Sequence, residues 1–195
     1  VMVVSDAEER ALDLPRGAFD VPLVLQDASF DGANQLVYTP SQMDGFLGNT
    51  MLVNGKRDFV LHAATRVYRL RLVNASVSRI YKLAWSDGTQ VVAIANDGGL
   101  LAAPRALPFL TPAPGERAEL WADFSAKSLG SQITLRSLAF SGAGGAQGAA
   151  MDVLRVSIDA VQAETLQLPA ALSTLEVYKI GDAINANNPR TFPIS

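Results

Sequence analysis

Apolar and polar residues alternate along several stretches of this 195-residue chain, and that alternation limits its fold more than any other feature. A period of two residues puts alternate side chains on opposite faces of an extended backbone, so it predicts strands with one buried face. The clearest cases are 67–73, 117–124 and 154–159. Shorter β-rich runs predict further strands at 21–30, 50–53 and 91–95. The alternation assigns these residues to inner faces: Tyr68, Leu70, Leu72, Ala118, Leu120, Ala122, Phe124, Leu154, Val156 and Ile158.

Turn dipeptides separate many of these stretches. They are Asp31-Gly32, Asp44-Gly45, Asn54-Gly55, Asp87-Gly88 and Asp97-Gly98. Such pairs tolerate the positive φ that tight reversals require. Many short strands joined by regular turns indicate an all-β fold, either an antiparallel sandwich or a barrel.

Helical signal is confined to 5–12. Ser5 is the expected N-cap, Glu8 holds the capping-box position, and Pro15 ends the helix.

Three other segments are predicted to lack a continuous strand. Prolines predict an extended surface loop over 104–114. The Gly/Ala-rich residues 141–150 are expected to form a flexible hairpin connection. After residue 160 the chain is predicted to be a linker with one strand at 175–180.

A single histidine and the absence of cysteine exclude most metal and thiol chemistry. The chain alone cannot form a cysteine-based zinc site, an iron–sulfur cluster or a blue-copper site, which needs two histidines and a cysteine. The net charge of −3 and the pI of about 5.1 leave no basic stripe for nucleic acid. No apolar run reaches the ~20 residues that span a bilayer, so no membrane span is expected.

Two motifs suggest ligand chemistry but have a simpler structural interpretation. The Gly-rich residues 142–148 resemble a phosphate-binding loop in composition, yet a predicted strand rather than a helix follows them. His62 as a base or a metal ligand would need orienting or co-ligating groups, which the sequence does not place. We therefore expect a connection at 142–148 and a structural histidine at position 62.

Paired carboxylates and a glycosylation motif are also expected to be structural. Glu8-Glu9, and Glu116 with Glu119, have the residue types of acid–base catalysis but are predicted to be solvated charges. Asn74-Ala75-Ser76 matches a glycosylation acceptor and is expected to make hydrogen bonds at the end of a strand. No catalytic, cofactor-binding or metal-binding residue is therefore predicted.

A series of motifs runs in order along the chain. They are Asp20-Val21-Pro22-Leu23-Val24-Leu25-Gln26-Asp27-Ala28-Ser29-Phe30, Gly45-Phe46-Leu47-Gly48-Asn49-Thr50 with Val53-Asn54-Gly55, Tyr68-Arg69-Leu70-Arg71-Leu72-Val73-Asn74-Ala75-Ser76, Arg79-Ile80-Tyr81, Asn96-Asp97-Gly98-Gly99-Leu100-Leu101-Ala102-Ala103-Pro104 and Pro114-Gly115-Glu116-Arg117-Ala118-Glu119. Together they resemble the second cupredoxin domain of bacterial multicopper oxidases of the laccase-like and cuprous-oxidase branch. Residues 152–156 resemble the closing strand of that domain.

The resemblance implies a Greek-key, cupredoxin-like sandwich over 20–160. It implies that 1–19 is the end of a preceding domain with its linker, and that 161–195 is a linker with the start of a following domain. This domain of the family holds no copper ligand, so copper is implied only in a longer parent protein. The flanking cupredoxin domains would be its partners. Self-association through exposed interfaces, and export to the periplasm or secretion, are further expectations.

Three functions stay open. The leading hypothesis is a structural spacer in a multicopper oxidase that oxidises phenols or metal ions and reduces dioxygen to water; the chain alone is not expected to be an enzyme. The alternative is a module of a copper-free relative with a structural role, such as a periplasmic cell-division factor. A third hypothesis is a free-standing sandwich that binds a ligand by itself.

Overall fold

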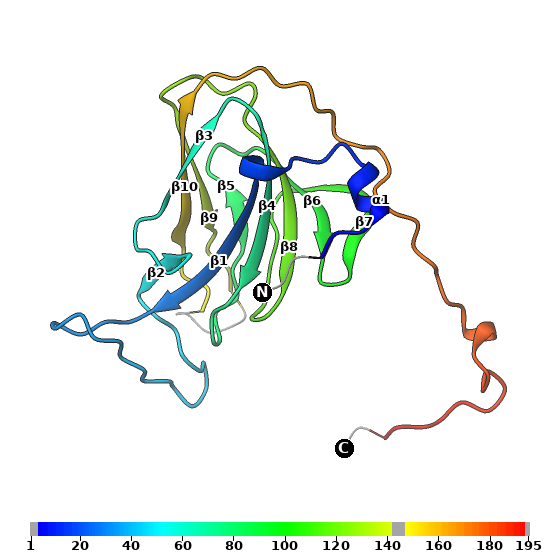
Figure 1. The fold of residues 1–195 in the computed structure, drawn as a ribbon. Coiled ribbons are helices and arrows are strands. Elements are labelled where there is room, and N and C mark those ends of the chain that lie inside the picture. The colour runs from blue at the N-terminus through cyan, green and yellow to red at the C-terminus, as the bar shows by residue number, and fades with distance from the viewer. Residues whose placement is uncertain (1–3, 142–146, 194–195) are drawn as a thin grey trace.

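The computed structural model describes residues 4–141 and 147–193, which form a two-layer β-sandwich (Figure 1). One sheet has six strands in the order β2-β1-β4-β8-β6-β7, and the other has four in the order β3-β10-β9-β5. The strands are β1 Asp20–Ala28, β2 Thr50–Val53, β3 Val60–Ala64, β4 Val67–Asn74, β5 Leu83–Trp85, β6 Val91–Asn96, β7 Gly99–Leu107, β8 Arg117–Asp123, β9 Gln132–Ser137 and β10 Met151–Ala160. The helices are α1 Ala7–Ala11 and the short 3₁₀ helices η1 Gly17–Phe19 and η2 Ile180–Asp182. The prediction of an all-β sandwich is confirmed.

Two strand pairs are parallel, so the prediction of an antiparallel fold is wrong at these places. β1 lies parallel to β4, and β3 lies parallel to β10, whereas the other pairs are antiparallel. Parallel neighbours need a crossover connection. The chain makes one by entering the four-stranded sheet as β3 before it returns to the six-stranded sheet as β4. Alternation predicts a strand but not its direction.

The main core lies between the two sheets. All the residues that the alternation assigns to inner faces are at most 6% exposed, from Leu70 and Val156 to Ala118. All of them except Ala118 belong to one hydrophobic cluster to which both sheets contribute. The predicted inner faces of β4, β8 and β10 are therefore confirmed.

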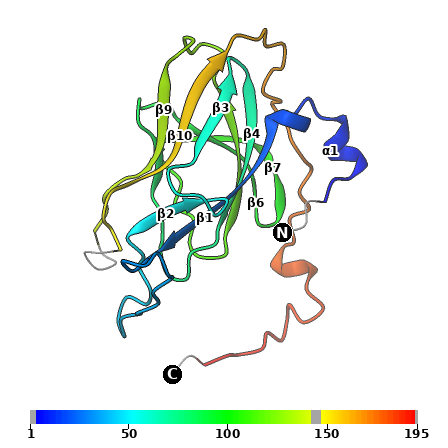
Figure 2. The same cartoon turned by 60° about the vertical axis from the view of Figure 1, so that its left-hand side comes forward.

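The outer face of the six-stranded sheet is also partly buried, which the alternation did not predict. Trp121 lies on the outer face of β8 as predicted, yet it is buried. It belongs to a second cluster, which we call the outer-face core: Leu14, Val67, Ile94, Trp121 and Leu172. Residues 5–16 (the N-terminal segment) and residues 161–173 (the strap) run over this face (Figures 1 and 2). The N-terminal segment and the strap therefore pack against the outer face of the six-stranded sheet and bury part of it.

Several local predictions are corrected by the structure. β3, β5 and β9 are strands that the sequence patterns did not predict. The proline-containing segment begins as β7 rather than as a loop, because Pro104 lies in an edge strand, where a missing N–H group is tolerated. The strand predicted at 175–180 is absent, since 174–179 has no regular structure and η2 follows it.

The helix at the N-terminus is present but starts one residue later than predicted. Asp6, not Ser5, is the N-cap of α1, and its Oδ1 accepts a hydrogen bond of 2.7 Å from the Glu9 amide. The capping-box role predicted for Glu8 is therefore wrong. The helix ends at Ala11, before Pro15.

Part of the predicted hairpin connection lies outside the described residues. β9 and β10 pair antiparallel, as a hairpin requires, but 142–146 cannot be described, nor can 1–3 and 194–195. The phosphate-loop comparison at 142–148 therefore has no structural test. Within the described part of the chain, no helix is long and apolar enough to cross a membrane.

Candidate functional site

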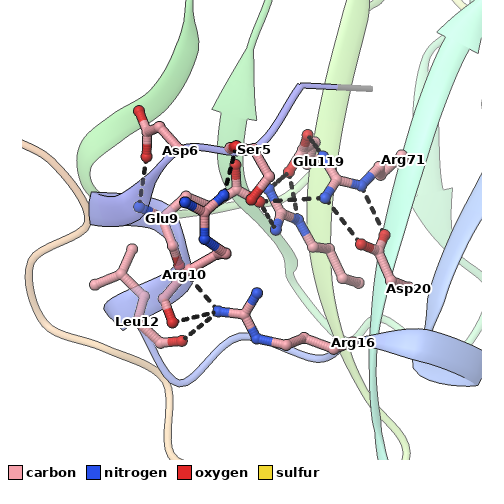
Figure 3. Close-up of polar contacts among 10 residues, drawn as sticks. Ser5, Asp6, Glu9, Arg10, Leu12, Arg16, Asp20, Arg71 and Glu119 are labelled. Carbon is pink, nitrogen blue, oxygen red and sulfur yellow. Dashed lines mark hydrogen bonds and ion pairs between the residues drawn. The ribbon is translucent and has the colours of Figure 1, made fainter. Parts of the chain in front are cut away.

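An ion-pair cluster holds the N-terminal segment to the outer face of the sheet (Figure 3). Because Leu70 and Leu72 face the main core, the intervening Arg69 and Arg71 of β4 project from the opposite face. Arg69 donates from Nη1 to Glu9 Oε1 at 2.6 Å and from Nε to Glu119 Oε2 at 2.6 Å. The cluster therefore joins α1, β4 and β8.

The second arginine extends the cluster to β1. Arg71 donates from Nη1 to Glu119 Oε1 at 2.5 Å. On its other side it binds Asp20 through two parallel bonds, from Nε at 2.6 Å and from Nη2 at 2.8 Å, as Figure 3 shows. Such paired bonds fit the planar guanidinium. Burial alone would lower the pKa of Arg71, but the bond to Asp20 and the charges of Glu119, Asp20 and Glu9 hold that pKa above its ordinary value.

The cluster overturns part of the prediction about the paired carboxylates. Glu9 and Glu119 are not solvated charges, because they are half-buried and pair with a side chain, Arg69, that is only 2% exposed. Glu8 and Glu116 are exposed, as predicted. The sequence offers no signal for the difference, since Glu9 and Arg69 are 60 positions apart.

Arg16 closes the C-terminal end of α1. Its Nη2 donates to the backbone carbonyls of Glu9, Arg10 and Leu12 at 3.1, 2.9 and 3.1 Å (Figure 3). The Glu9 and Leu12 carbonyls also accept from the Leu12 and Leu14 amides at 3.2 and 2.9 Å, and a cation is favourable beside the carbonyls at the C-terminal end of a helix. The N-terminal segment is therefore ordered both internally and against the sheet.

The strap is bound to the same sheet by backbone-directed hydrogen bonds. Thr65 Oγ1 donates to the Gln162 carbonyl and accepts from the Gln162 amide, each at 2.9 Å. Further along, the Leu172 amide donates to the Ala102 carbonyl at 2.9 Å. The strap therefore crosses the outer face from the start of β4 to the edge strand β7.

Glu164 is the main electrostatic anchor of the strap. Burial alone would raise its pKa, but the hydrogen bond from Arg66 and the amide groups of Val67, Leu166 and Thr165 outweigh burial and lower the pKa to about 2. The carboxylate form is therefore the one that holds the strap.

We expect acid to loosen the strap. The pKa of Glu164 is about 2 in the folded protein, against an ordinary value of 4.5. Its contribution to stability is therefore fully present above pH 4.5 and is lost as the pH falls towards 2. Hydrogen exchange of 161–173 across this window should show falling protection. Glu164→Gln is the control, because it should weaken the strap at neutral pH and remove this part of the pH dependence. Equal acid sensitivity in both proteins would contradict the assignment.

A second buried ion pair lies where β1 ends. The Asp27 side chain is fully buried, and its Oδ2 accepts from Arg79 Nε and from the Gly48 amide, each at 2.7 Å. Arg79 Nη2 in turn donates to the Gly48 carbonyl at 2.8 Å. A Cβ at Gly48 would lie 2.4 Å from the Ala28 amide nitrogen, so only glycine fits this approach. The pair therefore fixes the chain between β1 and β2.

The glycosylation-like motif has the structural role that was predicted. Asn74 is buried at the end of β4, and its Nδ2 donates to the carbonyls of Arg79 and Pro112 at 2.7 and 3.0 Å. Its Oδ1 accepts from the Ser76 amide at 3.0 Å. These bonds confirm the expected hydrogen bonding at a strand end.

A groove of about 810 Å³ lies between the strap and the sandwich, with Trp121, Phe124 and Leu166 among its lining residues. Its charged lining residues already have partners. Glu164 of the strap pairs with Arg66 and accepts from the Val67 amide, Lys127 pairs with Asp87, and Asp123 accepts from the Ser125 amide and hydroxyl. The groove therefore offers no obvious catalytic group.

The residues present do not fit a copper ion. The single histidine, His62, is exposed, and its Nδ1 pairs with the Asp159 carboxylate, which agrees with a structural role. Within 4–141 and 147–193, no three His, Cys, Asp or Glu side chains form a group that could hold a metal. Cupredoxin copper requires two histidines and a cysteine, which this chain does not contain.

Curated relatives of the chain are named cell division protein FtsP. The chain is 44% identical to FtsP of Sodalis glossinidius (strain morsitans) over 125 residues, which cover 63% of this chain and 26% of the relative. It is 41% identical to FtsP of Pectobacterium atrosepticum over 135 residues, which cover 68% and 28%. The chain thus spans about a quarter of the length of the curated relatives it matches. No family model matches it.

Solved structures of multicopper oxidases share the fold. The 2F4 variant of McoA multicopper oxidase from Aquifex aeolicus matches with a TM-score of 0.83 and 31% identity, over 92% of this chain and 41% of that one. The laccase-like oxidase CueO from Ochrobactrum sp. matches with a TM-score of 0.77 and 29% identity, over 91% and 40%. The chain is therefore a cupredoxin-like domain that matches part of the multicopper oxidases in structure and part of the cell division protein FtsP in sequence.

Proposed function

We propose that this chain is the middle, copper-free domain of a larger FtsP-like cell division protein, in which residues 20–160 form a structural spacer. The observation that carries the proposal is the 44% identity to FtsP over 125 residues, against 31% identity to the McoA variant. The cell-division alternative thus has more support than the oxidase hypothesis. We propose export to the periplasm on the resemblance alone.

The geometry of the two linkers supports a spacer role. The N-terminal segment precedes the domain in sequence and the strap follows it, yet both lie on the outer face of the six-stranded sheet (Figures 1 and 2). Leu14 from one and Leu172 from the other share the outer-face core. Modules attached before and after this domain would therefore be oriented by the same rigid surface.

A multicopper oxidase is the second candidate parent, and the TM-score of 0.83 to the McoA variant favours it. In that case this domain would hold its neighbours in register, and its own residues would take no part in the redox chemistry. The oxidation of phenols or metal ions would belong to other domains of the parent.

Copper titration and gene deletion in the source organism test the proposal. We expect the full-length protein to bind no stoichiometric copper, to show no blue absorption and to consume no dioxygen with phenols. We expect the deletion strain to show a division defect that the intact gene restores. A blue protein that oxidises phenols, together with a deletion strain that divides normally, would establish the oxidase instead.

We expect the two linkers to stabilise each other. Leu14→Ala and Leu172→Ala should each lower the unfolding free energy by about 2–3 kcal/mol, since both side chains are buried. Because they share one small core, their combined effect should differ from the sum by roughly 0.5–3 kcal/mol. Urea unfolding of the single and double variants measures this coupling, and the exposed Leu129→Ala should stay within ~0.5 kcal/mol of the parent. Strictly additive effects would show that the linkers are independent.

A further inference from the structure

A long loop between β1 and β2, which we call the arm (residues 29–48), projects from one end of the sandwich (Figure 1). It exposes large apolar side chains: Leu36 is 75%, Tyr38 64% and Met43 95% exposed. Exposed apolar side chains gathered on one feature are typical of a contact surface.

The arm is held in a defined shape by its own hydrogen bonds. The Val37 amide donates to the Ser29 carbonyl at 2.9 Å, and Ser41 and Gly45 exchange two backbone bonds of 2.8 and 3.2 Å. Gly45 has a φ of 70°, which favours glycine in this tight turn. The arm therefore presents its apolar side chains on an ordered backbone.

The base of the arm is anchored to the sandwich. The Asp27–Arg79 pair grips Gly48, as described above. Near the other end of the arm, Arg57 stacks on the Phe30 ring at 3.9 Å and donates to Asn34 Oδ1 at 2.8 Å. Because the arm is already ordered, it loses little conformational entropy when a partner binds it.

The exposed apolar surface continues from the arm onto neighbouring loops. Ser78 Oγ accepts from the Phe46 amide at 3.0 Å, and Val77 beside it is exposed. Gln147 links Ser78 to Ile80 through bonds of 2.6 and 3.0 Å. The loop at residues 75–82 therefore lies beside the loop that contains Gln147, at the same end of the sandwich.

Lys82 connects the remaining exposed side chains of this end. Its carbonyl accepts from the Leu138 amide at 2.8 Å, and its Nζ lies 4.3 Å from the Phe109 ring centroid. Leu138 and Phe109 are both exposed. We call the whole surface the apolar end: Leu36, Tyr38, Met43, Val77, Phe109 and Leu138.

The chain after the strap runs towards the apolar end. In both views residues 174–193 descend past the sandwich to the level of the arm, with the tail on the right and the arm on the left in Figure 1 (Figures 1 and 2). This tail carries exposed apolar side chains of its own: Leu175, Val177, Tyr178, Ile180, Ile184 and Phe192. The relatives are about four times longer than the region matched, and in the proposed multidomain protein the tail would lead to the following module.

We propose that the apolar end is the surface on which the module following residue 195 packs. The inference rests on the part of the proposed function that makes this chain one domain of a longer protein. Packing of a following module would bury the arm, the loops beside it and the apolar tail together, which accounts for the exposed apolar side chains on all three.

Site-specific cross-linking in the full-length protein tests the inference. A photo-reactive phenylalanine derivative in place of Met43 should cross-link within the same molecule to residues beyond 195. The same derivative in place of Leu129 should not, because Leu129 is exposed in the loop after β8, at the end where β4 begins. Cross-links from position 43 to the preceding module, to a second copy or to another protein, or their absence, would overturn the inference.

A stability comparison in the full-length protein gives a second readout. Leu36→Ser with Met43→Ser should lower the melting temperature by about 2–4 °C, because interdomain packing is weakened. Leu129→Ser with Val161→Ser replaces two exposed apolar residues outside the apolar end and should leave the melting temperature unchanged. Equal shifts would overturn the inference. The cross-linking result and the copper measurement test different proposals. If the full-length protein binds copper and oxidises phenols but position 43 still cross-links beyond residue 195, the cell-division proposal fails and the packing inference stands.

Discussion

Replacing Arg69 with methionine is expected to lower the unfolding free energy by about 3–5 kcal/mol. The arginine is only 2% exposed and bonds both Glu9 and Glu119. Methionine would fill much of the volume but leave these carboxylates and Asp20 with Arg71 as their one remaining partner in the cluster. Partly buried carboxylates without enough cations are costly, so α1 should also detach from the sheet.

Urea unfolding and protease cleavage within the N-terminal segment would measure both effects. Arg117→Met is the matched control, because Arg117 pairs with Asp97 on the surface, where about half of each side chain is exposed. Such a pair contributes less than ~1 kcal/mol. If the two substitutions cost the same, the cluster does not hold the N-terminal segment.

Replacing Arg79 with methionine is expected to destabilise the protein by a similar amount, about 3–5 kcal/mol. The Asp27 side chain is fully buried, so it cannot regain water when its cation is removed. The substitution should also free Gly48, whose carbonyl accepts from Arg79. Hydrogen exchange of the arm should therefore rise together with the loss of stability.

A compensating substitution distinguishes charge burial from lost packing. Asp27→Asn combined with Arg79→Met removes both charges, and the amide oxygen of asparagine can still accept from the Gly48 amide. The double variant should recover most of the lost stability, because replacing a buried pair by neutral groups is often close to neutral. A double variant no more stable than Arg79→Met alone would show that the charge of Asp27 is not the cause. Arg136→Met, which breaks an exposed pair with Asp152, serves as the surface control.

The strands with a full alternating pattern are predictable, and the shorter ones are not. β4, β8 and β10 each place every second side chain on a buried inner face, and this face is visible in the sequence alone. β9 has the same pattern, with Ile133, Leu135 and Ser137 buried, so its signal was available. β5 has three residues, all buried, and exists because it pairs with β9. A strand this short has no local period to detect.

The candidate site shows a different limit. Arg69 and Arg71 occupy positions that alternation assigns to solvent, and Glu9 lies in a short polar helix. Solvated charges are the ordinary expectation for such positions. They became a buried cluster because α1 folds over the sheet, which no pattern within either segment reveals.

The amino-acid order is enough to indicate the sandwich, its inner faces and the resemblance to one domain of the multicopper oxidases, because the buried face of a strand recurs at every second residue. It also excludes a blue-copper site within the chain, since two histidines and a cysteine are not all present. The ion partners of Arg69, the burial of Trp121 and the shared core of the two linkers emerge only on folding. These contacts join residues tens of positions apart. The sequence around a carboxylate does not show whether water or a distant arginine will be its partner in the folded protein.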